Sequence, residues 1–471
     1  MLLYQRSINE QQLPMLWKTA HVIPVCKGKE SKFDVSNYRP ISLTSIFCKI
    51  METVIRTSIF EHCKTNNILI NEQHGFLPDH STTTNLLEFI NDISTTLDIN
   101  GNIDAVCIDF AKAFDTVCHS KLLLKLEHYG IRGKVLGWIK NFLYNRSIKV
   151  LVNNTFSNKL PVPSSVPQGS VLAPILFILY INDIKDAIEN CQFKLYADDL
   201  TIYRFIRNNN DVSLLQQDLH NILNWTNKWQ LKINIEKCKV LHFGKNNLKH
   251  TYNINNNPIT TSDCEKILGC LIDTNLTFKQ HIFGIVKKAK NMCNQLLHTF
   301  YFCDRSVLVN LYKTYVRPSL EYASIIFSPH HLYLIDVLEN VQKHFTKRLP
   351  GLKTVSYVDR LSFCKLESLE LRRIYNDLIF MYKIMHNTVA VKLENCIIPA
   401  DSHITRGNVL KLKKIRCNLN VRKFFFVFRT IDLWNKLHND VVLARNVNIF
   451  ITKLKSSGAI FSTKGRALLH A

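Results

Sequence analysis

The sequence contains no long hydrophobic run. The longest one, VLAPILFILYI at 171–181, has eleven residues and includes a proline, whereas a membrane-spanning helix needs about 20 apolar residues. The first residues, MLLYQRSINEQQLPML, also lack the charged start, apolar run and small-residue cleavage site of a signal peptide. These absences predict a soluble protein.

The fourteen cysteines form no C-x-x-C pair and no Cys/His group at zinc-binding spacing. The closest two, Cys264 and Cys270, are six positions apart, which is not a metal-ligand spacing. No repeat of about 20–50 residues is visible either, which excludes a solenoid. We predict mostly buried thiols in a reducing, intracellular compartment.

Acidic residues are scarce, with 37 Asp and Glu against 60 Lys and Arg, a formal net charge of +23 over 471 residues. Residues 1–280 hold 30 basic and 25 acidic residues, a net of +5, and residues 281–471 hold 30 and 12, a net of +18. This asymmetry predicts a polyanionic partner of the C-terminal part, either nucleic acid or an acidic membrane surface. A basic solvated surface without a dedicated ligand is the simpler alternative.

The pattern of apolar residues changes along the chain. AVCIDF at 105–110 and KVLHF at 239–243 are predicted strands, and AKAFDTVCHSKLLLKLEHYG at 111–130 is a predicted helix. From about residue 277 the pattern is helical, apart from FFFVF at 424–428, which we interpret as a buried strand. The fold class expected from this pattern is α+β, with a mixed first part and a helical second part.

The stretch FKLYADDLTIY at 193–203 places two adjacent aspartates between two predicted strands. Alternating apolar residues predict a hairpin whose turn lies at Asp198 and Asp199. Such neighbouring charges repel and raise each other's pKa unless water or a cation screens them. The pair is therefore either a solvated turn or half of a metal site.

Asp109 supplies a third carboxylate, at the end of the predicted strand 105–110. A lone aspartate there is usually a cap or turn residue. If this strand neighbours the hairpin, however, three carboxylates meet at one sheet edge and offer the oxygen ligands that Mg²⁺ prefers. In a basic protein, such a site suggests metal-dependent nucleotidyl transfer on a nucleic acid.

Eight blocks in this order resemble the reverse transcriptases of non-LTR (LINE-type) retrotransposons, the jockey-like group. They are WKTAHVIPVCK (17–27), NYRPISL (37–43), NEQHGF (71–76), IDFAKAFDTV (108–117), SVPQGSVLAPILFILYINDI (165–184), YADD (196–199), LKINIEKCKVLHF (231–243) and ILGCLID (267–273). LYKTYVRPSLEYAS and FFFVFRTIDLWNKLHNDVV also look like later regions of that family. The resemblance therefore covers nearly the whole chain.

The resemblance implies a right-hand polymerase fold. Fingers and an antiparallel-sheet palm would occupy residues 1–275, a helical thumb 276–350, and a basic, mainly helical region 351–471. The implied activity is RNA-directed DNA synthesis, in which deoxynucleotides are added to a DNA primer on an RNA template with two Mg²⁺ ions, or Mn²⁺ in their place.

Specific residues acquire roles from the same resemblance. Asp109, Asp198 and Asp199 match the carboxylates that hold the metal ions, and the backbone carbonyl of Phe110 matches a further ligand. Lys237 matches a lysine that protonates the leaving pyrophosphate, although a solvated lysine at a strand start is an equal alternative.

The incoming nucleotide has matching residues of its own. Phe114 matches the bulky side chain that excludes a 2′-hydroxyl, and Gln168 and Gly169 match residues that line the nucleotide pocket. Lys27 and Arg39 lie in finger-like segments where basic side chains meet the triphosphate.

Leu268 and Gly269 match the turn that grips the primer end. Asp115, although close to the first aspartate, is expected on the following helix to cap or pair rather than to bind metal. Trp225 and Trp229 are expected in the core because they share helical spacing with neighbouring apolar residues.

Two positions depart from the family pattern, His80 where a basic residue often precedes the serine, and Ala173 where Ser or Gly is usual. The start of the chain looks like the middle of the fingers, so we expect the polymerase portion of a truncated element. Three alternatives remain: a non-catalytic nucleic-acid-binding remnant, an RNA-dependent RNA polymerase, and a basic membrane-surface protein.

Overall fold

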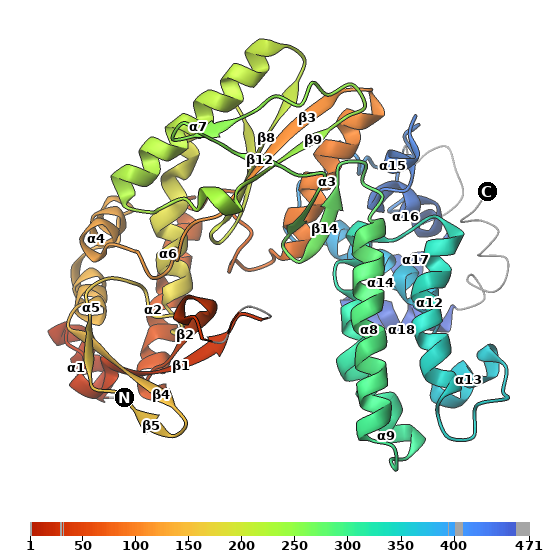
Figure 1. Ribbon diagram of the computed structural model, residues 1–471, viewed down its shortest axis with the longest axis horizontal. Coiled ribbons are helices and arrows are strands. Elements are labelled where there is room, and N and C mark those ends of the chain that lie inside the picture. The colour runs from red at the N-terminus through yellow and green to blue at the C-terminus, as the bar shows by residue number, and fades with distance from the viewer. Residues whose placement is uncertain (1, 29–30, 32, 394, 401–407, 458–471) are drawn as a thin grey trace.

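The computed structural model describes residues 2–28, 31, 33–393, 395–400 and 408–457. The described chain forms an arch whose top is a central sheet with the long helix α7 (Figure 1). The N-terminal elements descend on one side of the arch, and the helices of the C-terminal half descend on the other.

The central sheet has five strands in the order β12-β9-β3-β8-β7. They are β3 (Asn102–Ile108), β7 (Gln192–Tyr196), β8 (Asp199–Ile206), β9 (Lys239–Phe243) and β12 (Thr260–Thr261). Neighbouring strands are antiparallel, apart from the parallel pair of β12 and β9. The strands predicted from AVCIDF, FKLYADDLTIY and KVLHF are confirmed.

The two faces of this sheet belong to two separate cores. The helices that cover them are α3 (Thr82–Asp98), α6 (Ala173–Ile181) and α7 (Asn209–Trp229). In β3, Ile103 and Ala105 share a core with α3, whereas Val106 and Ile108 share the other with α6 and α7. Because side chains of a strand point alternately to opposite faces, both faces of β3 are apolar and buried.

The N-terminal side carries a second sheet of order β2-β1-β4-β5, with β6 paired to β4. Its strands are β1 (Thr19–Cys26), β2 (Tyr38–Leu43), β4 (Arg146–Val152), β5 (Thr155–Phe156) and β6 (Leu160–Val162). The helices around it are α1 (Leu2–Glu10), α2 (Ile46–Thr65), α4 (His119–His128) and α5 (Gly133–Leu143). Short 3₁₀ turns are η1 (Met15–Trp17), η2 (Val35–Asn37), η3 (Asn182–Ala187) and η4 (Ile235–Lys237).

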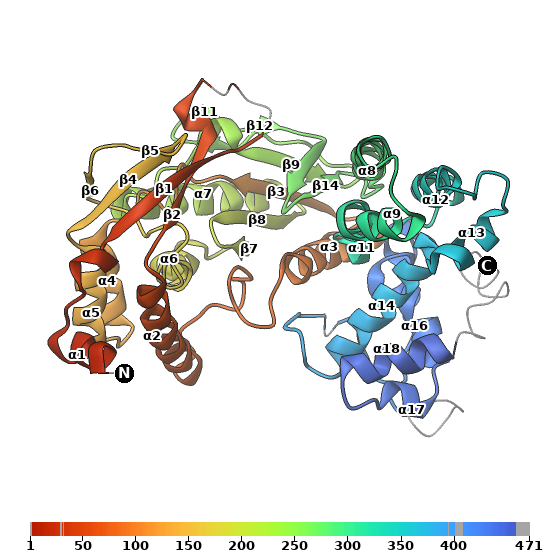
Figure 2. The same cartoon turned by 90° about the horizontal axis from the view of Figure 1, so that it is seen from below.

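Two hairpins precede the C-terminal helices, β10 (Asn253–Ile254) with β11 (Asn257–Pro258), and β13 (Cys264–Ile267) with β14 (Cys270–Asp273). The helices are α8 (Lys279–Thr299), α9 (Arg305–Leu311), the π-helical η5 (Tyr312–Val316), α10 (Arg317–Glu321), α11 (Ser324–Phe327), α12 (Leu332–Lys347), α13 (Tyr357–Cys364), α14 (Leu369–Met385), α15 (Asn420–Lys423), α16 (Phe426–Asn435), α17 (Asn439–Val442) and α18 (Val447–Ser456). Helix α3 reaches from the sheet to α11 and α15, so the C-terminal helices share its core (Figure 2).

Two predicted elements are wrong in type or extent. FFFVF is buried as expected, but its last residues begin helix α16 rather than a strand, because a short apolar run does not distinguish a buried strand from a buried helix. The helix predicted over 111–130 begins only at His119. Residues 111–115 form turns, and Lys112 has a left-handed φ of 51°, which is incompatible with a right-handed helix.

Within the part of the chain that the structure describes, no helix combines the length and apolar character that crossing a bilayer requires. Each of the fourteen cysteines is a free thiol.

Candidate active site

Strand pairing brings the three predicted aspartates to one edge of the central sheet. Ile108, the last residue of β3, pairs with Leu200 of β8. The residue that follows it, Asp109, therefore lies beside Asp199. Tyr196 pairs with Asp199 across the hairpin, which leaves Ala197 and Asp198 as its two-residue turn. The turn therefore lies one residue earlier than predicted, and Asp199 begins β8.

The carboxylates of the site act on one another electrostatically. The pKa of Asp199 is raised to about 6, first by loss of hydration and then by the negative charges of Asp198 and Asp109. The pKa of Asp198 is also raised by burial and by Asp109, against an opposing effect of Arg39.

This carboxylate group fits the chemistry of a divalent cation. Oxygen ligands suit Mg²⁺, and a bound cation would remove the repulsion that raises the pKa of Asp199. Among the described residues, however, no set of three or more His, Cys, Asp or Glu side chains is arranged closely enough to hold a metal ion. The metal ligands, including the Phe110 carbonyl, therefore remain a prediction.

Lys237 lies beside the first aspartate. Its Nζ is 3.8 Å from Oδ2 of Asp109, and 66% of its side chain is exposed. The backbone fixes this neighbourhood, because Asn234 N donates to Asp109 O at 2.8 Å and Phe110 forms an antiparallel bridge with Ile233. The Lys237 ammonium group therefore lies next to Asp109 and remains exposed to solvent.

The loop with Gln168 and Gly169 lies against the strand β2. Ser42 N donates to the Gln168 carbonyl at 2.7 Å. Gly169 has a φ of +111°, and a Cβ there would lie 2.5 Å from Ser42 O, so only glycine permits this approach. The Gln168 side chain donates to Asp115 Oδ1 at 2.8 Å, which confirms that Asp115 pairs, although in a turn rather than on a helix.

Phe114 is half-buried and stacks on Phe177, with ring centroids 4.3 Å apart and planes 20° apart. Phe76 meets its ring edge-on at 6.3 Å. Its orientation is thus fixed by two other aromatic rings.

Two cations of the second sheet act on this site. Burial raises the pKa of Asp198 and of Asp115, and a nearby cation partly opposes each rise: Arg39, on β2, acts on Asp198, and Lys27, after β1, acts on Asp115. Lys27 and Arg39 therefore influence acidic residues of the site electrostatically.

Leu268 and Gly269 form the two-residue turn between β13 and β14, both with left-handed φ values, 45° and 86°. Tyr322 of the C-terminal half donates its hydroxyl to Leu268 O at 2.7 Å. The predicted primer turn is therefore anchored by Tyr322, the residue that follows helix α10.

Comparison with known proteins identifies the family. The family model described as reverse transcriptase (RNA-dependent DNA polymerase) matches residues 27–272, a range that contains every predicted site residue. The chain belongs to this family.

Known reverse transcriptases of mobile elements are similar to the chain. The probable RNA-directed DNA polymerase from transposon X-element of Drosophila melanogaster is 26% identical over 353 residues, 72% of this chain and 38% of the relative. The enzyme from the mobile element jockey of the same organism is 27% identical over 355 residues, with the same coverage. The chain thus spans about 38% of the length of these relatives, and the predicted resemblance to LINE-type reverse transcriptases is confirmed.

A solved structure of apo telomerase from Candida tropicalis is similar at 12% identity and a TM-score of 0.43, over 83% of this chain and 67% of that one. Family membership and the observed mixture of helices and sheets confirm the α+β polymerase fold.

Residues without a predicted catalytic or binding role form polar contacts in the interior. Lys125 is buried, with its Nζ 2.5 Å from Asp183 Oδ1 and 3.7 Å from the ring centre of Trp229. Trp225 donates to the same Asp183 oxygen at 3.1 Å. The two tryptophans are therefore part of the interior, as predicted, and enclose a lysine whose pKa burial lowers to about 8.

The two departures from the family pattern lie in well-formed local structure. His80 Nδ1 is 2.7 Å from Pro78 O, and its ring centre lies 5.1 Å from that of His74. Ala173 is the first residue of α6, and its N–H donates to Ser170 Oγ at 3.0 Å. Gln73 lies in the block NEQHGF and had no predicted role. Its side chain accepts a hydrogen bond from Ala197 N in the aspartate turn.

Proposed function

We propose that the protein is an RNA-directed DNA polymerase that adds deoxynucleotides to a primer 3′-hydroxyl and releases pyrophosphate. The observation that carries this proposal is the strand register that aligns Asp109 with the Asp198–Asp199 pair in a chain of the reverse transcriptase family. RNA template, DNA primer and deoxynucleoside triphosphates are the proposed partners.

Asp109, Asp198, Asp199 and the Phe110 carbonyl would hold two Mg²⁺ ions, or Mn²⁺. Bound there, the ions would activate the attacking hydroxyl and neutralise charge on the phosphates. Lys237 is close enough to this group to act as the proton donor for the leaving pyrophosphate, since its Nζ lies 3.8 Å from Asp109.

The remaining roles follow the same arrangement. Arg39 and Lys27 would meet the triphosphate, and Gln168 with Gly169 would line the nucleotide pocket. The ring of Phe114, fixed by Phe177, would occupy the space that a 2′-hydroxyl needs. Leu268 and Gly269 would hold the primer end.

We further propose fingers and palm in residues 1–275, a thumb at 276–350 and a basic C-terminal region at 351–471. The soluble, intracellular location predicted from the sequence is kept as part of this proposal.

Primer extension tests the activity. The protein, given poly(rA)/oligo(dT), dTTP and Mg²⁺, is expected to extend the primer, and the Asp198→Ala, Asp199→Ala double variant is expected to lose at least about 10³-fold in rate, because it removes two of the three carboxylates. Asp186→Asn, which changes an exposed aspartate on η3, should extend at the wild-type rate.

Two outcomes would favour an alternative. Bound template–primer without extension by the wild type would indicate a non-catalytic remnant. Preference for GTP over dGTP on a poly(C) template would indicate an RNA polymerase and would contradict the role proposed for Phe114.

A further inference from the structure

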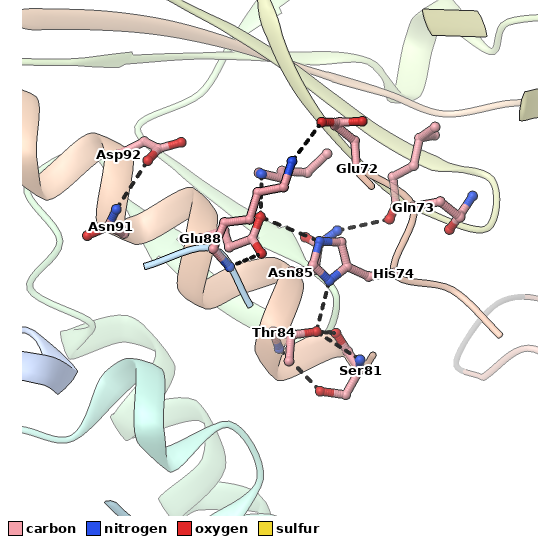
Figure 3. A network of polar contacts seen from close by, with 12 residues as sticks. Glu72, Gln73, His74, Ser81, Thr84, Asn85, Glu88, Asn91 and Asp92 are labelled. Carbon is pink, nitrogen blue, oxygen red and sulfur yellow. Dashed lines mark hydrogen bonds and ion pairs between the residues drawn. The ribbon is translucent and has the colours of Figure 1, made fainter. Parts of the chain in front are cut away.

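Gln73 is almost completely buried, with 1% of the residue exposed. It lies between α2 and α3, in the block NEQHGF, and its segment forms a parallel bridge with Leu195 of β7 (Figure 3). His74 N donates to Leu195 O at 2.8 Å, and Leu195 N donates to Glu72 O at 2.9 Å. The segment therefore runs along the edge of the hairpin that carries the aspartate pair.

The Gln73 side chain holds the turn of that hairpin. Its Oε1 accepts hydrogen bonds from Ala197 N at 2.9 Å and from Gly75 N at 2.7 Å, and its Nε2 lies 3.5 Å from Ala197 O. One amide thus contacts the peptide groups on both sides of Ala197. The second of these peptide groups joins Ala197 to Asp198.

The turn is a place where such support matters. Ala197 has a left-handed φ of 56°, which is unfavourable for a residue with a Cβ. The two carboxylates that follow it are neighbours in the sequence, and like charges this close repel each other. Without a partner for its amide, the turn could relax and carry both aspartates with it.

The segment around Gln73 is itself fixed. His74 Nδ1 is 2.8 Å from Thr84 Oγ1, and Asn85 Nδ2 donates to Leu195 O at 3.0 Å. Glu88 Oε2 pairs with Lys194 of β7 at 2.5 Å. Figure 3 shows these side chains converging from α3 on the segment and on the strand. A Cβ on Gly75 would lie 2.3 Å from Ala197 N, so the chain approaches the turn as closely as glycine allows.

We propose that Gln73 is a positioning residue for the aspartate pair, which keeps the Ala197–Asp198 turn in the geometry that nucleotide addition needs. This inference rests on the proposed function, because it concerns the same site. Displacements of about 1 Å at a reacting centre can cost on the order of 10²-fold in rate.

The test is Gln73→Met, which keeps the side-chain length but removes all three polar contacts. The kcat for single-nucleotide addition should fall about tenfold or more, while the dNTP KM and the Kd for template–primer stay within about twofold. Deuterium exchange of the 193–203 peptide should rise, and Mn²⁺ binding measured by electron paramagnetic resonance should weaken.

Gln216→Met is the matched control. Gln216 grips the backbone of Asn253 in the same way, with Oε1 2.9 Å from Asn253 N and Nε2 2.8 Å from Asn253 O, away from the aspartates. The Gln216→Met substitution should lower Tm and leave kcat and the deuterium exchange of the 193–203 peptide unchanged.

Equal kcat values in the two variants and the wild type would overturn the proposal. So would equal losses in both variants that follow their Tm values, since these would assign Gln73 a purely structural role. If the wild type does not extend primers, the proposed function fails separately. Exchange and Mn²⁺ binding then decide: a change confined to Gln73→Met supports the positioning role, and no change overturns it.

Discussion

Single residues at the sheet edge combine opposite requirements. Asp109, Asp198 and Asp199 would need negative charge to bind a cation, yet burial and the neighbouring carboxylates raise the pKa of Asp199 to about 6. Arg39 offsets part of this at Asp198. The site would therefore favour a bound cation, and it loses negative charge as the pH falls.

Metal affinity should depend on pH through Asp199. Its ordinary pKa is 3.8 and the folded value is about 6, so Mn²⁺ affinity should be full above about pH 7 and fall up to about tenfold per unit below pH 6. Titration with Mn²⁺ between these values measures it. Asp199→Asn should reduce the slope of Mn²⁺ affinity against pH by one proton. A wild-type affinity that is equal at pH 5 and 7.5 would contradict the prediction.

The metal-free protein should show the opposite trend in stability. A carboxyl whose pKa is raised on folding keeps its proton more firmly in the folded state, so its contribution to the free energy of unfolding is present below about pH 4 and is lost by pH 6. The difference between wild type and Asp199→Asn isolates this contribution from those of other groups.

Among the elements, α3 joins the two halves of the molecule. Its N-terminal part contacts β7 through Asn85 and Glu88. Further along, Arg422 donates to Asn91 Oδ1 and to Ser94 Oγ, both at 2.9 Å. One helix therefore supports the hairpin at one end and binds the C-terminal helices through buried polar contacts.

Removing the Arg422 contacts should destabilise the protein. Arg422→Met removes this donor from the buried Asn91 and Ser94, so the free energy of unfolding should fall by about 1–3 kcal/mol. Urea unfolding measures this change. Arg445→Met, at an exposed position of the same region, should change it by less than about 0.5 kcal/mol. Equal effects of the two substitutions would show that the Arg422 contacts do not stabilise the packing of the C-terminal helices on α3.

Over the whole molecule, positive charge gathers in the second part of the chain. Residues 281–471 carry 30 basic and 12 acidic residues, and the first 280 are near neutral. A cavity of about 340 Å³ in this part is lined by Lys313, Arg317, Lys365, Arg372, Lys455 and Glu367, together with Leu366. Such a distribution fits the phosphate backbone of a nucleic acid.

Template–primer binding should therefore weaken steeply with salt. If about six phosphates are contacted, affinity should fall on the order of 10³-fold between about 50 and 200 mM salt. Fluorescence anisotropy at several salt concentrations measures the slope. Lys365→Glu should lower the slope by about one, whereas Lys134→Glu, exposed on α5 in the near-neutral part, should not. Binding that is insensitive to salt would exclude this role for the basic region.

The sequence alone predicted the residues of the candidate site and determined much of the fold. Local alternation of apolar residues predicted β3, β9 and the β7–β8 hairpin, and the ordered blocks identified the family. These features are encoded locally, in residue types and spacings that are readable one segment at a time.

Only the tertiary structure decided which distant segments support the site. Phe426 begins a helix rather than a strand because burial between helices, and not its local pattern, sets its conformation. Gln73 meets Ala197, and Arg422 meets Asn91, across separations of 124 and 331 residues. No spacing in the sequence encodes such pairs, because they exist only when packing brings the segments together and leaves their buried polar groups no other partner.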